Sequence, residues 1–267
     1  MAFTPKLFSE MTQLIANSLS AGHYDVRFAE SDEEIKAAQN LRYEVLFKES
    51  GGRINKEMLN TEREEDEWDE IAYHVVVLDR KANDKVVGTV RLVSGHCLKK
   101  DQMFYTEHAF DLGGLLKHYG SVIELSRACV SPEGRGGAIL MLIWKFTMQF
   151  IEHNNYDVLF GCASFSGTDY KQHTEILSYL YKSHLAEPEF MPIPRPDVES
   201  VAINSFNNQS ESRGKVPTLL RGYLKIGARV SDHAIIDQVF NTTFVAIYVD
   251  AKQMFKTDHA LVNKSVK

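Results

Sequence analysis

The chain has 267 residues, of which 44% are hydrophobic and 25% are charged, and this ordinary globular composition can build one large domain or two small ones. Its formal net charge of -6 excludes a basic field over the whole molecule, so nucleic acid is not expected as a partner. The three cysteines are widely separated and show no Cys-x-x-Cys spacing. This pattern argues against a disulfide framework and a zinc site and indicates a reducing compartment.

No apolar run approaches the roughly 20 residues that a membrane-spanning helix needs, and the polar stretch from Met1 to Ser20 is unlike a signal peptide. We therefore expect a soluble or membrane-peripheral protein. Between Leu7 and Leu19, apolar residues at helical spacing predict a helix that either covers the core or docks on a partner. A helix lying on a membrane surface is usually more basic.

A strand and a capped helix come next in the chain. The segment from Tyr24 to Ala29 alternates like a strand, and Ser31 followed by acidic residues is an N-cap signal. It predicts a helix from Asp32 to Phe47. The charge run from Glu62 to Glu70 is typical of a solvated face or a mobile loop.

Trp68-Asp69 is an exception within this run. It directly precedes a predicted strand from Ala72 to Leu78, where a loop residue can reach the edge of a cleft. A short turn joins that strand to another from Val86 to Val93, which predicts a hairpin. Arg91 places a charge inside the second strand.

The segment from Ser121 to Ile151 organises the rest of the chain. An apolar strand ends at Val130, Pro132–Gly137 break it, and apolar residues at helical spacing then predict a long helix. A glycine loop that opens a helix presents free N–H groups to an anion such as phosphate, although a plain turn explains the glycines equally well. Glu124 and Arg127 are charges in this strand, so they either pair across the sheet or line a cleft.

A second buried strand, from Asp157 to Phe165, follows the long helix. A right-handed crossover would bring the two strands side by side or nearly so. Asp169 is then either the N-cap of a helix from Tyr170 to Ser183 or a site residue. The proline-rich segment from Met191 to Pro196 indicates a linker, and Asn204 to Lys215 a mobile loop.

The C-terminal part contains one well-marked helix, which begins at Pro217 and ends at Gly227. The segments Ala234–Asp237 and Thr243–Val249 are short strands by composition, and the last residues resemble a frayed tail.

Many of these segments, in this order, resemble the ornithine lipid N-acyltransferases, and the resemblance spans roughly Tyr24 to Asp250. Those enzymes belong to the GNAT superfamily and are similar to acyl-homoserine lactone synthases, which share the Glu-x-Ser-Arg strand. The segments that carry the resemblance are Arg42-Tyr43-Glu44-Val45, Trp68-Asp69 to His74, Val87 to Leu92, Phe104 to Glu107, Glu124-Leu125-Ser126-Arg127, Leu159 to Phe165, Gly167-Thr168-Asp169 and Leu219 to Ala228.

The resemblance implies an α/β, GNAT-like acyltransferase fold, in which helices flank a mixed, twisted central sheet and a C-terminal extension adds helical and short-strand elements. We expect an N-terminal helix in residues 1–23, an acyltransferase core in 24–190, an extension packed on the core in 191–250 and a tail in 251–267.

The resemblance also implies transfer of a 3-hydroxyacyl group from acyl carrier protein to the α-amine of ornithine, giving lyso-ornithine lipid. The 4'-phosphopantetheine of the carrier protein would be the donor arm, with no tightly bound cofactor and no metal. Ser131 stands where coenzyme A-using relatives usually begin their pyrophosphate loop with Gln or Arg, which fits a donor with one phosphate there. A cytoplasmic enzyme in peripheral contact with the inner membrane would suit this reaction. Basic residues for carrier-protein docking would be Lys99, Lys100, Lys117 and Arg135.

The resemblance assigns roles to particular residues. Glu124 would receive the amine, as an ammonium anchor or as a base acting through water, and a backbone N–H near Val130, where GNAT relatives have a strand bulge, would polarise the thioester carbonyl. Arg127 and Arg91 would bind the acceptor carboxylate or order the cleft. The remaining candidates are Arg42 and Asp69, which would close the cleft, Asp169 at the substrate, and Gly134, Arg135, Gly136 and Gly137 at the phosphopantetheine.

Other hypotheses remain open. A buried structural charge network would also explain the presence of charged residues at Glu124, Arg127, Arg42 and Asp69. The acceptor would be another amino acid or a homoserine-lactone precursor if the pocket shape selects it. A non-catalytic, membrane-associated protein with this fold is the alternative outside enzymes.

Overall fold

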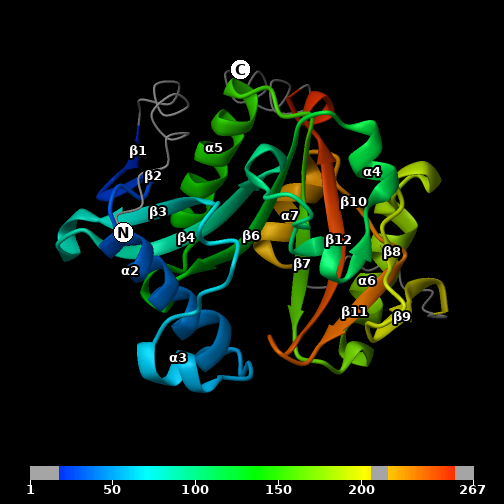
Figure 1. Ribbon diagram of the computed structural model, residues 1–267, viewed down its shortest axis with the longest axis horizontal. Coiled ribbons are helices and arrows are strands. Elements are labelled where there is room, and N and C mark those ends of the chain that lie inside the picture. The colour runs from blue at the N-terminus through cyan, green and yellow to red at the C-terminus, as the bar shows by residue number, and fades with distance from the viewer. Residues whose placement is uncertain (1–17, 206–215, 256–267) are drawn as a thin grey trace. The chain divides into compact units, whose positions relative to one another are not determined.

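The computed structural model describes residues 18–205 and 216–255, which fall into two compact units (Figure 1). Strands β4 (Lys85–Ser94) and β6 (Val122–Val130) each contribute residues to both units. Of the described residues, the first unit contains 18–49, 54–92 and 127–155, and the second contains 50–53, 93–126, 156–205 and 216–255.

The first unit is built on antiparallel strands that pair in chain order. They are β1 (Leu19–Ala21), β2 (Tyr24–Phe28), β3 (Tyr73–Asp79) and the first part of β4. The expected hairpin is therefore confirmed, with β3 and β4 joined through a short turn. Neither β3 nor β4 has an exposed side chain apart from Lys85, because both faces of this sheet are covered.

Helices α2 (Asp32–Arg42) and α5 (Ala138–His153) cover opposite faces of this sheet. On β3, the ring of Tyr73 lies 5.2 Å from that of Phe150 in α5. Val76 instead belongs to a buried cluster with Ala38 and Leu41 of α2. Successive side chains of a strand point to opposite faces, so the two helices must lie on different sides of β3.

The helix expected from Asp32 begins as predicted, since the Ser31 hydroxyl accepts a hydrogen bond from the N–H of Glu34 at 3.2 Å. Its regular α geometry ends at Arg42, however. The chain continues as a π-helix, η2 (Tyr43–Glu49), and a short helix α3 (Lys56–Thr61) follows. A π-helix is rare and sequence periodicity does not announce it.

The predicted order of strand, glycine loop and helix is confirmed by β6, η6 (Pro132–Gly134) and α5. Gly137 is the N-cap of α5 and has a φ of +90°, a left-handed conformation that glycine adopts freely. The apolar face of α5 is buried, whereas Lys145 and Gln149 are exposed. The buried face consists of Ile139, Leu142, Ile143, Phe146 and Phe150.

The second unit contains the other half of the sheet. The N-terminal part of β6 pairs in parallel with β7 (Val158–Ser166), as the crossover predicted, and the strand order continues β12, β11, β9. These strands are antiparallel and comprise β12 (Thr242–Asp250), β11 (His233–Asp237) and β9 (Ser200–Ala202), with β10 (Arg229–Val230) also on β12. The helices of this unit are α4 (Gly113–His118), α6 (Thr174–His184) and α7 (Thr218–Lys225), and the last begins directly after its N-cap Pro217, one residue later than predicted.

Several segments differ from the sequence-based expectation. The proposed linker contains a short strand, β8 (Ile193–Pro194), that pairs with β5 (Phe110–Asp111). The helix expected from Tyr170 begins as a 3-10 turn, η7 (Tyr170–His173), before α6. Residues 251–255, expected as tail, are helical, and Ala251 and Met254 are buried.

Two expectations fall partly or wholly on residues that the structure does not describe. Residues 7–17 of the expected N-terminal helix lie outside the described residues, while Leu19 belongs to strand β1. Most of the expected loop from Asn204 to Lys215 also lies outside them. The expected boundaries at residues 23, 190 and 250 stay a prediction.

Within residues 18–205 and 216–255, no helix is both long enough and apolar enough to cross a membrane.

Candidate functional site

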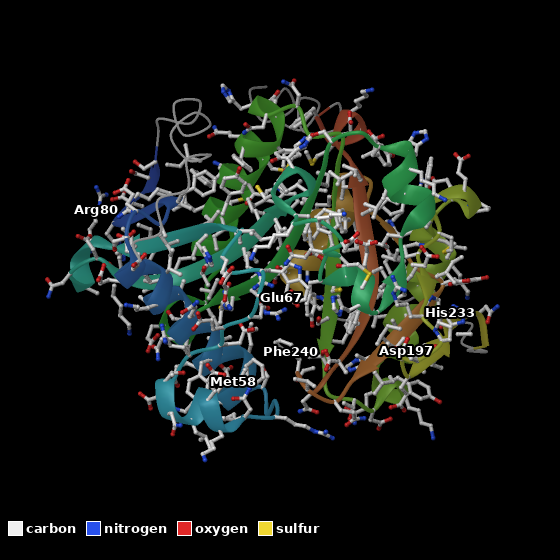
Figure 2. The ribbon with its side chains drawn as sticks, in the orientation of Figure 1. Met58, Glu67, Arg80, Asp197, His233 and Phe240 are labelled. Atoms are coloured by element: carbon white, nitrogen blue, oxygen red, sulfur yellow. The ribbon has the colours of Figure 1, made fainter. Side chains whose placement is uncertain are left out.

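The charge run from Glu62 to Glu70 is not a uniformly solvated face, which corrects the expectation from composition. Glu64 and Asp69 are 2% and 9% exposed, and Trp68 between them is buried as well. The acids that remain exposed include Glu67, labelled in Figure 2. The segment thus turns one set of acids inward, and every inward acid needs a partner because an unpaired buried charge is costly.

Arg42 supplies the first partner from the C-terminal end of α2. Its Nε donates to Oε2 of Glu64 at 2.5 Å, and its Nη1 and Nη2 donate to the two oxygens of Asp69 at 2.7 and 2.8 Å. Arg42 is only 1% exposed. Burial alone would raise the pKa of Asp69, but the hydrogen bonds and charge of Arg42, with the charge of Arg91, hold that pKa well below its usual range.

Arg91 reaches the same acids from β4. Its Nη1 donates to Asp66 and, at 3.0 Å, to Oδ1 of Asp69. The guanidinium also lies 5.9 Å from the centroid of the Trp68 ring, within the range of a cation–π contact. The charge that Arg91 places inside its strand is therefore paired.

Arg127 completes the set from β6. Its Nε donates to Oε1 of Glu64 at 3.0 Å and its Nη2 to Oδ2 of Asp66 at 2.9 Å. Its backbone φ is +55°, a left-handed conformation that costs a non-glycine residue about 1–2 kcal/mol. The left-handed residue of β6 is thus Arg127, which lies three residues before Val130, the residue near which a strand bulge was expected.

These six side chains form one interconnected group in the first unit, which we call the charge cluster. Three arginines face three carboxylates, so the formal charges cancel when all six are ionised. A buried group of this kind is tolerated when its charges are mutually paired, and it becomes strongly destabilised when one partner is removed. The members are Arg42, Glu64, Asp66, Asp69, Arg91 and Arg127.

The cluster unites four of the residues predicted as site residues, Arg42, Asp69, Arg91 and Arg127. Glu64 and Asp66 were missed, because residue type alone does not distinguish them from the exposed acids of the same run. The available signal was indirect: Arg91 and Arg127 lie in otherwise apolar strands and need acidic partners, and the 62–70 run is rich in acids.

His74 on β3 lies beside the cluster. Its Nε2 is 3.0 Å from the backbone oxygen of Asp69 and 4.0 Å from that residue's Oδ1. Burial lowers the pKa of His74 more than the nearby Asp69 carboxylate raises it, and the charges of Arg42 and Arg91 lower it further. His74 is therefore a neutral structural partner at pH 7.

Glu124 lies in the second unit and is fully buried. Its Oε2 accepts the N–H of Tyr105 at 3.1 Å and its Oε1 accepts the N–H of Thr106 at 2.7 Å. Glu124 is therefore paired with backbone groups of the second unit, whereas Arg127, Arg42 and Asp69, the other residues of the network hypothesis, belong to the charge cluster of the first unit.

The segment that Glu124 holds is fixed by further contacts of the second unit. The Thr106 hydroxyl lies 3.5 Å from the sulfur of Cys162, and Arg195 donates to the backbone oxygen of Glu107. Tyr105 stands edge-on to Phe240, labelled in Figure 2, with ring centroids 6.5 Å apart. Glu124 thus holds a segment that several contacts of the second unit keep in place.

The glycine loop ahead of α5 carries Arg135, which is exposed and paired with Glu49 at the end of η2. Both guanidinium Nη atoms lie 2.6 Å from the carboxylate oxygens. A Cβ on Gly136 would meet nothing within 4 Å, whereas one on Gly134 would approach Cδ1 of Ile139 to 2.4 Å. A side chain at Gly134 would thus have to displace the end of the Ile139 side chain, while Gly136 leaves the backbone open on its outer side.

Asp169 is exposed, and its carboxylate accepts from the N–H of Lys171 at 3.2 Å and from the side chain of Gln172 at 3.2 Å. These contacts are those of a helix cap, one of the two roles considered for it. A contact with substrate stays a prediction.

Comparison with known proteins bears on these residues. A model of the acetyltransferase (GNAT) domain matches residues 41–145, which contain the charge cluster, Glu124 and the glycine loop. An L-ornithine N(alpha)-acyltransferase of Agrobacterium fabrum is 32% identical over 236 residues, covering 85% of this chain and 80% of that protein. The chain belongs to the L-ornithine N(alpha)-acyltransferase family.

A second member of the L-ornithine N(alpha)-acyltransferase family, from Rhodobacter capsulatus, is 30% identical over 250 residues, covering 91% of this chain and 96% of that protein. The expected GNAT-like α/β fold is confirmed by the domain match together with the mixed strands and flanking helices of the structure. A solved N-acyl amino acid synthase from uncultured soil microbes covers 90% of this chain and 96% of its own, with 9% identity and a TM-score of 0.45.

Proposed function

We propose that this protein is an N-acyltransferase that moves a 3-hydroxyacyl group from acyl carrier protein to the α-amine of L-ornithine. The observation that carries the proposal is the 32% identity to the Agrobacterium fabrum L-ornithine N(alpha)-acyltransferase over most of both chains. In the reaction the amine nitrogen forms an amide bond to the acyl carbon, the thioester C–S bond breaks, and the phosphopantetheine leaves as its thiol. The product is lyso-ornithine lipid.

Activation of the amine is a small part of the barrier. An α-amine has a pKa of about 8, so about a tenth is unprotonated at pH 7, which costs about 1.4 kcal/mol. Glu124 is proposed to hold the ammonium form and to receive its proton, directly or through water. The support is a fully buried carboxylate whose position is set by Tyr105 and Thr106.

Polarisation of the thioester carbonyl is expected to lower the barrier by a larger amount. One well-placed backbone donor is worth about 3–4 kcal/mol at an oxyanion. We propose that an N–H of β6 between Arg127 and Val130 supplies it, where the left-handed Arg127 interrupts the strand. Burial raises the pKa of the Cys129 thiol to about 12, which keeps it protonated and favours direct transfer over an acyl-enzyme.

The donor is proposed to be acyl carrier protein, with the phosphate of its 4'-phosphopantetheine at Gly134, Arg135, Gly136 and Gly137. Three further basic residues proposed for docking, Lys99, Lys100 and Lys117, are exposed. A cytoplasmic location with peripheral contact to the inner membrane suits a lipid product. In this proposal Arg91, Arg127, Arg42 and Asp69 order the acceptor site.

The test is to incubate the purified protein with 3-hydroxyacyl-acyl carrier protein and single amino acids, with detergent or lipid present, and to identify products by mass spectrometry. A 3-hydroxyacyl-ornithine product is expected. A product with another amino acid would show that this amino acid is the acceptor, and the proposed mechanism would still apply. With the donor intact and no product from any amino acid, the proposal would be wrong and a binding role would replace it.

A further inference from the structure

Arg127 is unusual among the described residues that have a positive φ. The other non-glycine residues with a positive φ are Asn, Asp or Glu and lie in turns or at helix ends, whereas Arg127 lies inside strand β6. The small polar Asn and Asp tolerate this conformation because their side chains hydrogen-bond locally, and arginine has no such advantage. Something other than local preference must therefore hold Arg127.

Two carboxylates of the charge cluster hold its side chain. Glu64 and Asp66 each accept one hydrogen bond from the guanidinium, at 3.0 and 2.9 Å, and the side chain of Arg127 is 7% exposed. Charge-assisted hydrogen bonds are among the strongest in proteins. They fix the direction of the guanidinium and limit the backbone conformations from which it can be reached.

The two carboxylates are themselves braced from other elements. Arg42 of α2 donates to Glu64, and Arg91 of β4 donates to Asp66. The backbone N–H of Asp66 also donates to Asp69 at 3.1 Å. We call Glu64 and Asp66 the clamp on Arg127. Through Arg42 and Arg91 the clamp is anchored to helix α2 and strand β4 of the first unit.

We infer that Glu64 and Asp66 are positioning residues that hold Arg127 left-handed and so set the direction of the following N–H, that of Ala128. A left-handed residue turns the next peptide out of the regular strand pattern. This inference rests on the proposed acyl transfer, because it assumes that the backbone N–H set by the clamp is the one that donates to the thioester carbonyl. The clamp acts on the reaction through the backbone, and neither carboxylate touches the substrate.

The first experiment measures the backbone without substrate. The chemical shift of the Ala128 amide is recorded for the wild type, for Asp66→Asn and for Glu67→Gln, an exposed control in the same segment. Asp66→Asn is expected to shift this amide and Glu67→Gln to leave it in place. An unchanged Ala128 amide in folded Asp66→Asn would overturn the inference, whether or not ornithine is the acceptor.

The second experiment measures turnover. Asp66→Asn is expected to lower kcat about tenfold, the scale of one weakened transition-state contact, with less than about a twofold change in the KM values for ornithine and donor. Asp66→Glu should recover part of the loss. Unchanged kcat with a raised KM for ornithine would overturn the inference and make the cluster a substrate site.

If Asp66→Asn folds poorly, a comparison of two further variants, Arg127→Gly and Arg127→Gly with Asp66→Asn, keeps the test decisive. Arg127→Gly removes one cation and accepts a left-handed backbone without a clamp, so Asp66→Asn added to it restores the balance of the cluster. Because no guanidinium remains to be held, the second change should alter kcat less than about twofold. A further tenfold loss in the double variant would show that Asp66 acts by another route and overturn the inference.

Discussion

Arg42 donates to both carboxylate oxygens of Asp69, at 2.7 and 2.8 Å, and both residues are buried within the first unit. Asp69 also accepts from Arg91 and from the N–H of Asp66. One carboxylate therefore joins the end of α2, strand β4 and the segment that precedes β3.

Asp69→Asn should destabilise the protein strongly, because it leaves Arg42 and Arg91 short of one buried negative charge. The free energy of unfolding should fall by about 3–5 kcal/mol, measured by urea denaturation. Glu44→Gln, which breaks the exposed pair with Lys48, should leave the urea midpoint unchanged. Equal midpoints for Asp69→Asn and the wild type would mean that the cluster contributes nothing to stability.

His74 should make stability depend on pH below neutrality. Its pKa is lowered in the folded protein, so below an unfolded pKa of about 6.5 the unfolded chain binds the proton first. The free energy of unfolding should therefore decrease as pH falls from 7 to 5. His74→Gln should flatten this dependence, whereas His96→Gln, an exposed control, should keep it. An identical slope in His74→Gln and the wild type would contradict the assignment.

Glu124→Gln should lower both stability and acyl transfer. A glutamine side chain offers one acceptor oxygen where Tyr105 and Thr106 use two, so one buried N–H loses its partner at a cost of about 1–3 kcal/mol. Glu107→Gln is the matched control in the same segment, since the contact with Phe104 uses one oxygen. Intact thermal stability and intact acyl transfer in Glu124→Gln would rule out the anchoring role.

Glycine substitutions should separate packing from loop flexibility. A Cβ on Gly161 would lie 2.3 Å from the backbone oxygen of Leu125, so Gly161→Ala should prevent β7 from pairing with β6 and yield little folded protein. Gly136→Ala should fold normally, because its Cβ meets nothing within 4 Å. Circular dichroism and soluble yield measure both outcomes, and a well-folded Gly161→Ala would contradict the pairing.

Glu49→Gln should release Arg135 for the donor phosphate. The KM for acyl carrier protein should fall about two- to fivefold at low salt, the scale of an exposed ion pair, and the gain should disappear at high salt. Arg135→Gln should raise the same KM. If Glu49→Gln leaves the low-salt KM unaltered, the pair does not compete with donor binding.

Much of the fold was predictable because local signals agree with it. Four features follow from residue type and spacing. They are the N-cap at Ser31, the hairpin of β3 and β4, the glycine loop and the apolar face of α5. The π-helix after Arg42 and the strand within Met191–Pro196 were not predictable, since long-range packing and pairing determine them.

The candidate site was predictable as a set of charges but not as a network. Arg42, Asp69, Arg91 and Arg127 were recognisable from family resemblance or from their apolar context. Which acids of the 62–70 run turn inward depends on where α2, β4 and β6 bring their arginines together, and that is a property of the folded chain.

The π-helix from Tyr43 to Glu49 gives this region a tolerance for chain length that a regular helix lacks. Each turn of a π-helix takes up about one residue more than an α turn, so deleting a single residue there would let the helix return to α geometry. Residues beyond that deletion would keep their direction, whereas the same deletion in a regular α-helix would rotate them by about 100° around the helix axis. Glu49 would thus stay directed at Arg135, and the pair ahead of α5 would survive the loss of one residue.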